Sequence, residues 1–187
     1  MTNIAIRWSG LLLIAGAALL GTAIVMASLA PDMTQIPRPA NALLFLAAIL
    51  LLLSLPAMYA RQADAAGWLG LIGHMLLQTG VLLFPVVSAP ALLYSSFDRP
   101  FENSVTAFLL GIALTLGLLA TGIATLRAAV FPRWAGILLL AGTAGFFFSF
   151  FIAEWLPYLA GQVVGVIMSI ILGLALAWIG LSMWTGR

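Results

Sequence analysis

"RWAGILLLAG", residues 133–142, decides the fold of this chain, because an earlier stretch repeats it almost letter for letter. The earlier stretch, "RWSGLLLIAG" at residues 7–16, is identical to it at seven of ten positions. A shorter copy, "GWLGLIG" at residues 67–73, keeps the tryptophan and the glycine two positions later. The tryptophans of successive copies are 60 and 66 residues apart. Recurrence at such intervals indicates an internal repeat.

Each copy begins a long apolar stretch. The chain is 64% hydrophobic and 6% charged, with a mean hydropathy of +1.21, whereas soluble domains carry about a quarter charged residues. A helix of about twenty apolar residues crosses a hydrocarbon core of about 30 Å. Such stretches lie at residues 8–29, 40–60, 67–89, 104–126, 134–154 and 160–184. We therefore expect an all-α integral membrane protein in which six transmembrane helices form one bundle over residues 1–187.

The arginines mark the boundaries of the repeat. Arg61 and Arg127 each stand seven residues before a repeated tryptophan, and Arg187 closes the chain at the equivalent place. We expect three two-helix hairpins that share one orientation and pack about a pseudo-threefold axis or in a row. The expected units are residues 1–61, 62–127 and 128–187.

The arginines also predict the orientation in the membrane. With six spans, one side receives both termini and five arginines, and the other side receives Arg38 and Arg99. Cytoplasmic loops carry the excess of basic residues, so the N and C termini are expected in the cytoplasm. The formal net charge of +2 follows from this distribution, and we expect no nucleic-acid partner.

Small and aromatic residues have expected structural roles. Interfacial tryptophans anchor helices, and small residues let helices approach closely in lipid. Four-residue spacing predicts one small-residue ridge in the fifth span and one in the sixth, with Gly145 near Ser169 and Ser149 near Gly165. A second copy of the chain is the alternative partner for either ridge. The residues assigned are Trp8, Trp68 and Trp134 as anchors, and Gly145, Ser149, Gly161, Gly165, Ser169 and Gly173 for packing.

The third span carries the clearest polar exception. His74, Gln78 and Thr79 stand where the other repeats are apolar or small, and polar groups inside a bilayer are costly. One interpretation is that they join helices, through Thr115, Thr121 or Ser54. The other is that His74 carries a proton or binds a headgroup, quinone or pigment. Glu154 is a candidate at the outer interface.

The absences in the sequence exclude several chemistries. The chain has no cysteine, which excludes thiolate metal sites, and we predict no metal site and assign no catalytic residue. All seven basic residues are arginine, so a retinal Schiff base to lysine is excluded. The cofactor stays open between none and an apolar ligand such as lipid, quinone or pigment.

Two stretches resemble a known group of proteins. "LPAMYARQADAAGWLGLIG" at residues 55–73 and "FPRWAGILLLAG" at residues 131–142 are similar to small bacterial multispan membrane proteins of a family without assigned function. This resemblance implies a multi-pass protein of the bacterial cytoplasmic membrane.

The near absence of charge within the spans predicts a noncatalytic membrane protein. We expect a scaffold or complex subunit that packs with copies of itself or within a larger membrane complex and holds lipid or another apolar molecule. The alternative is a transporter or channel for small molecules or ions. A membrane enzyme that uses His74 is the third possibility.

Overall fold

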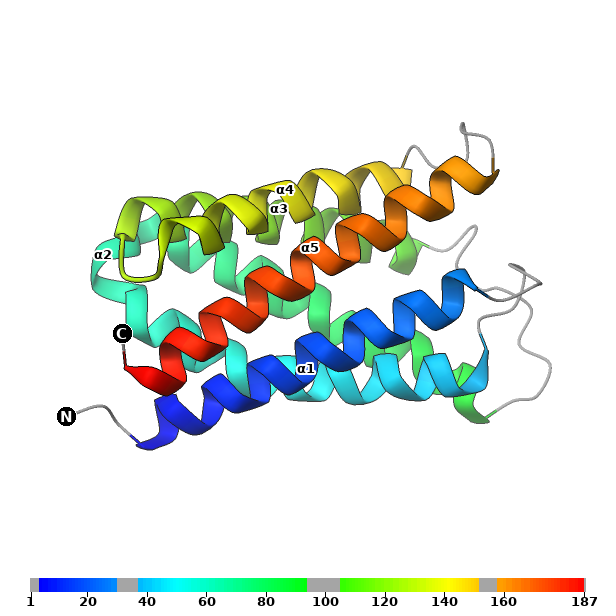
Figure 1. Cartoon of the computed structure of the whole chain (residues 1–187), viewed down its shortest axis with the longest axis horizontal. Coiled ribbons are helices and arrows are strands. Elements are labelled where there is room, and N and C mark those ends of the chain that lie inside the picture. Colours follow the sequence, from blue (N-terminus) through cyan, green and yellow to red (C-terminus); the bar gives the residue numbers. More distant parts are fainter. Residues whose placement is uncertain (1–3, 30–36, 94–104, 152–157, 187) are drawn as a thin grey trace.

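The structure, a computed structural model, describes residues 4–29, 37–93, 105–151 and 158–186. Regular structure in these ranges is entirely α-helical. The helices run side by side along one axis (Figure 1). They are α1 (Ile4–Ser28), α2 (Arg38–Leu93), α3 (Val105–Ala128), α4 (Arg133–Phe151) and α5 (Tyr158–Thr185).

The second and third predicted spans are joined in α2. Helical structure continues from Arg38 to Leu93 except at Gly67, whose φ of 58° and ψ of −155° interrupt it. A residue with a side chain rarely adopts this backbone conformation, whereas glycine adopts it readily. Residues 38–66, the first arm, and residues 68–93, the second arm, run in opposite directions on either side of the bend (Figure 1). A connection was expected between residues 60 and 67, and the structure makes the reversal at one residue.

Within the described residues, four helices are long and apolar enough to cross a membrane. They are Ile4–Ser28, Arg38–Val86 with its bend, Phe108–Ala128 and Val163–Thr185. Arg133–Phe148, within α4, is a shorter apolar helix. Large hydrophobic side chains are exposed on the outer faces of all five helices. The chain is therefore a helical bundle with the surface of a membrane protein.

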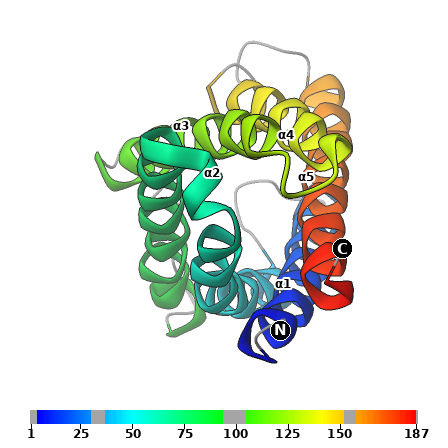
Figure 2. The ribbon, with the colours of Figure 1, turned by 90° about the vertical axis from the view of Figure 1, so that its left-hand side faces the viewer.

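The helices close into a ring. Each helix packs against the next in sequence, and α5 packs against α1, as the view along the bundle shows (Figure 2). The start of α1, the bend of α2, the turn between α3 and α4 and the end of α5 lie at one end, here named the bend end (Figure 1). Four of the arginines belong to this end: Arg7, Arg61, Arg127 and Arg133.

Glycines allow the closest approach between neighbouring helices. A methyl group added at Gly10 of α1 would lie 2.5 Å from the carbonyl oxygen of Gly180 in α5, and one at Gly180 would lie 2.6 Å from the carbonyl oxygen of Gly10. A methyl group at Gly73 in the second arm would lie 2.7 Å from the backbone nitrogen of Thr121 in α3. These contacts of backbone on backbone are typical of helix association in lipid.

The contact between α4 and α5 is one residue away from the prediction. Gly145 was predicted to lie near Ser169, and the residue that faces it is Met168. A methyl group at Gly142 would lie 3.0 Å from Leu172 Cβ. Gly173 instead faces α1, where a methyl group would lie 3.7 Å from the carbonyl oxygen of Ala17. The small-residue face of α4 is thus filled by large side chains of α5 instead of meeting a second small-residue ridge.

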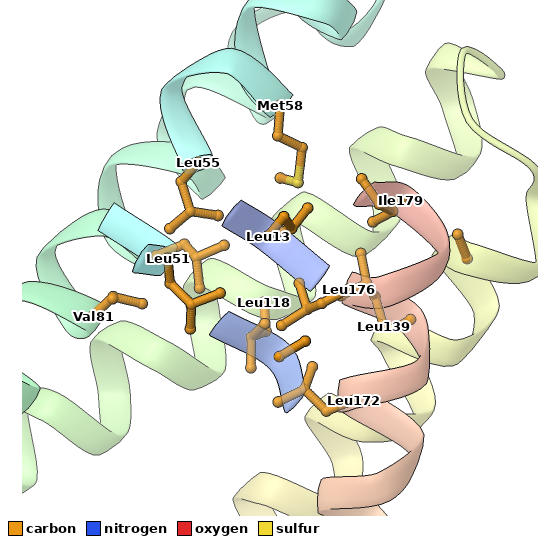
Figure 3. Packing of buried hydrophobic residues seen from close by; sticks show 14 of the residues in the cluster. Leu13, Leu51, Leu55, Met58, Val81, Leu118, Leu139, Leu172, Leu176 and Ile179 are labelled. Atoms are coloured by element: carbon orange, nitrogen blue, oxygen red, sulfur yellow. The ribbon is translucent and has the colours of Figure 1, made fainter. Parts of the chain in front are cut away.

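The interior of the ring is aliphatic. Buried side chains from all five helices belong to one hydrophobic cluster (Figure 3). Leu13, Leu55, Leu139 and Ile179 are at most 1% exposed. Dispersion contacts among such side chains contribute to holding helices together in lipid, where water provides no driving force between them.

Candidate functional site

His74 lies in the half of the interior nearest the bend, against an aromatic ring. Tyr59 of the first arm stacks on His74 of the second arm with ring centroids 4.8 Å apart and an interplanar angle of 17°. The two residues stand eight positions before and seven positions after Gly67, so the reversal at Gly67 brings them to the same level. His74 is 6% exposed. The bend thus brings the half-buried Tyr59 ring onto the buried His74 ring between the two arms.

A buried polar pair lies one helical turn closer to the bend. Thr125 of α3 donates a hydrogen bond to Oε1 of Gln62 in the first arm, with 3.2 Å between the oxygens. Both side chains are 1% exposed. The pair joins two segments that are 63 residues apart in sequence. It lies between the stacked rings and the bend end.

Thr121 belongs to the same level as His74. The close approach of Gly73 to the backbone of Thr121 sets this level on α3. Thr121 is also one helical turn deeper than Thr125, as Tyr59 is about one turn deeper than Gln62. The side chain of Thr121 is 1% exposed. Two buried atoms at this level, His74 Nδ1 and Thr121 Oγ1, have no hydrogen-bond partner among the described residues.

Aliphatic side chains close the layer on its other side. One turn further from the bend stand Leu55 in the first arm, Leu77 in the second arm and Leu118 in α3. These three side chains are at most 3% exposed. His74, Tyr59 and Thr121 are here named the His74 layer. This layer has polar neighbours toward the bend end and apolar neighbours toward the middle of the bundle.

Two arginines at the bend end bind the last turn of α5. Arg61 Nη1 donates to the carbonyl oxygen of Ser182 at 2.6 Å, and Arg7 Nε donates to the carbonyl oxygen of Trp184 at 3.0 Å. The final carbonyls of a helix lack partners within the helix and carry its negative dipole end. The Arg61 guanidinium also lies 5.4 Å from the centroid of the Phe131 ring.

The other residues of the predicted polar group lie apart from the His74 layer. Gln78 is half-buried, and Thr79 is exposed. The Thr79 hydroxyl donates to the carbonyl oxygen of Met75 at 2.8 Å, within its own helix. The hydroxyl of Ser54 likewise donates to Leu51 at 3.0 Å. The structure brings His74 together with Tyr59, and places the Thr79 side chain on the outer face.

The other predicted residues lie partly within the described part of the chain and partly outside it. Trp8, Trp68 and Trp134 are 60%, 79% and 68% exposed at the bend end, and their role as interface anchors stays a prediction. The Ser169 hydroxyl donates to the carbonyl oxygen of Gly165 at 2.7 Å. Glu154, the side chain of Ser149 and the surroundings of Gly161 lie outside the described residues.

The sequence pattern does not single out Tyr59, Gln62 or Thr125. The apolar stretch ends at residue 60, so residues 61–66 were expected in a connection, where Gln62 would be solvated. Because the first arm continues to residue 66, Gln62 becomes buried. One signal in the sequence could have indicated this burial: Gln62 is followed by alanine-rich, helix-forming residues up to Gly67. Among the described residues, no group of three His, Cys, Asp or Glu side chains is placed to hold a metal ion.

Comparison with known proteins returned no match of any kind. No family model matches the chain, no curated protein is similar to it, and no solved structure resembles it.

Proposed function

We propose that this chain is a noncatalytic integral membrane protein, a scaffold or complex subunit that packs with copies of itself or with other membrane proteins and holds lipid or another apolar molecule. The observation that carries the proposal is the mostly aliphatic cluster of buried side chains, to which Leu13 and Leu172 belong. This cluster lies inside a ring of helices that the contact between α1 and α5 closes. Transport sites in membrane bundles use broken helices and polar groups near the midplane. An interior that is mostly aliphatic, with fewer buried polar side chains, favours a structural role.

The proposal includes six spans, with the two arms of α2 as separate spans and α4 as a sixth. The reversal at Gly67 supports this count, because each arm has more than the roughly twenty residues that a bilayer requires. The arginines of the bend end support a cytoplasmic location for both termini. The three-hairpin repeat and a bacterial cytoplasmic membrane remain predictions from the sequence.

A transporter or channel is the second candidate, and one observation favours it. His74 is buried, and its Nδ1 has no hydrogen-bond partner in the part of the chain that the structure describes. Intramembrane ionisable residues often belong to ion or proton pathways. An enzyme would need a second reactive group. Asp64 is the one acidic residue within the described ranges, and it is exposed.

The test is native mass spectrometry, with an absorption spectrum of the same sample, on protein extracted gently from its own membrane. We expect retained lipid, a chromophore or a second subunit at defined stoichiometry. Reconstituted protein should pass no more ions or protons across liposomes than protein-free liposomes do. A bare monomer that conducts, and loses conduction in His74→Leu, would contradict the scaffold and establish the second candidate.

A further inference from the structure

We propose that the His74 layer is a binding site for one internal water molecule, held between His74 Nδ1 and Thr121 Oγ1. Both atoms are buried and have no partner among the described residues. Buried polar atoms in native proteins are almost always hydrogen-bonded, to protein or to ordered water. The third such atom, Thr115 Oγ1, lies about 9 Å further along α3. His74 Nδ1 and Thr121 Oγ1 share one level of neighbouring helices, and we therefore assign one partner to both.

The hydroxyl of Thr121 differs from those of most other described threonines. Thr22, Thr79, Thr143 and Thr185 each donate to the carbonyl oxygen four residues earlier. Thr125 donates across to Gln62 instead, and the hydroxyls of Thr121 and Thr115 have no partner among the described residues. Of the two α3 threonines nearest the bend, one therefore bonds outside its own helix and the other is available to a partner there.

The chemistry of the two atoms suits water. A neutral imidazole nitrogen either donates or accepts one hydrogen bond, and a hydroxyl can donate one and also accept. Water can donate to or accept from both atoms. An internal water commonly bridges polar groups that would otherwise be unsatisfied. Leu55, Leu77 and Leu118, each at most 3% exposed, lie at the next level inward, so the polar partner belongs at the level of the two atoms.

The surroundings give the water one route of exchange. The Gln62–Thr125 pair lies one turn toward the bend, and the three leucines lie on the opposite side. We expect the water to exchange with the bend end past the polar pair.

The experiment is solution NMR of the full chain in detergent micelles, with labelled threonine methyl groups and labelled histidine. The probe is water itself, observed through nuclear Overhauser cross-peaks. We expect a cross-peak between water and the Thr121 methyl group at least threefold stronger than that of Thr143. Thr143 is the matched control, because it is 3% exposed and its hydroxyl bonds to Leu139 of its own helix.

A second measurement uses variants that keep the shape of the side chain. Thr121→Val should remove the water cross-peak of the His74 ring, while Thr143→Val should leave it unchanged. Equal cross-peaks at Thr121 and Thr143, a direct hydrogen bond between His74 and Thr121, or cross-peaks to detergent or lipid in place of water would each overturn the proposal. If Thr121→Val does not fold, the wild-type comparison of Thr121 with Thr143 still decides it.

Discussion

Arg7 at the start of α1 and Trp184 at the end of α5 are joined twice. Arg7 Nε donates to the Trp184 carbonyl oxygen at 3.0 Å, and the guanidinium carbon lies 4.8 Å from the centroid of the indole ring. Trp8 adds an edge-to-face contact with the same indole, with centroids 6.1 Å apart. The two ends of the chain are therefore held together where the ring of helices closes.

Replacing Arg7 should loosen this closure. We expect Arg7→Gln to lower the free energy of unfolding by about 1 kcal/mol, since a hydrogen bond and an exposed cation–π contact each contribute about that much or less. Thermal unfolding in detergent measures the effect. Arg133→Gln is the control, because Arg133 is exposed and the change there should stay within about 0.5 kcal/mol. Equal effects of the two changes would contradict a specific role for Arg7.

The Gly10–Gly180 contact predicts a larger effect at the same interface. A methyl group in Gly10→Ala would lie 2.5 Å from a carbonyl oxygen of α5, so α1 and α5 must separate. Overpacking of this kind costs about 1–3 kcal/mol. Gly21→Ala on the same helix meets nothing within 4 Å and should stabilise the protein by up to about 1 kcal/mol through helix propensity. Unfolding curves of the two variants should shift in opposite directions.

The backbone at Gly67 predicts that the reversal of α2 depends on glycine. A side chain at Gly67 has open space around it, so any cost of Gly67→Ala comes from φ 58° and ψ −155° alone. Backbone strain of this type costs about 1–3 kcal/mol. Gly21, which also has open space but lies within α1, is again the comparison. Similar stabilities of Gly67→Ala and Gly21→Ala would show that the bend tolerates a side chain.

The buried Gln62–Thr125 pair should show energetic coupling. In a double-mutant cycle with Gln62→Leu and Thr125→Val, we expect a coupling energy of about 0.6 kcal/mol, the average for hydrogen bonds between membrane helices, and at most about 1.7 kcal/mol. Gln62→Leu combined with Thr143→Val should be additive within about 0.5 kcal/mol, because Thr143 bonds only to Leu139 within its own helix. Additivity in both cycles would show that the Gln62–Thr125 hydrogen bond does not stabilise the protein.

The sequence predicted the positions of the helices well and the buried polar layer in part. Hydropathy locates the apolar stretches, and repeated tryptophans locate the bend end, because both depend on local composition. His74 stood out as polar among apolar residues. Its partner Tyr59 did not, since the stacking depends on a reversal at Gly67, whose position hydropathy leaves undefined by several residues. Gln62 was assigned to a connection for the same reason.

The absence of native cysteine makes the six-span proposal testable by single-cysteine labelling. Asp64→Cys places a thiol at the bend, and Leu29→Cys places one at the end of α1, where Leu29 is 77% exposed. If the arginine-rich end is cytoplasmic, an impermeant maleimide should label Leu29→Cys in intact cells and Asp64→Cys only after permeabilisation. The wild-type chain, which should remain unlabelled, is the control. Labelling of both thiols from one side would contradict the six-span arrangement, and the reverse pattern would invert its orientation.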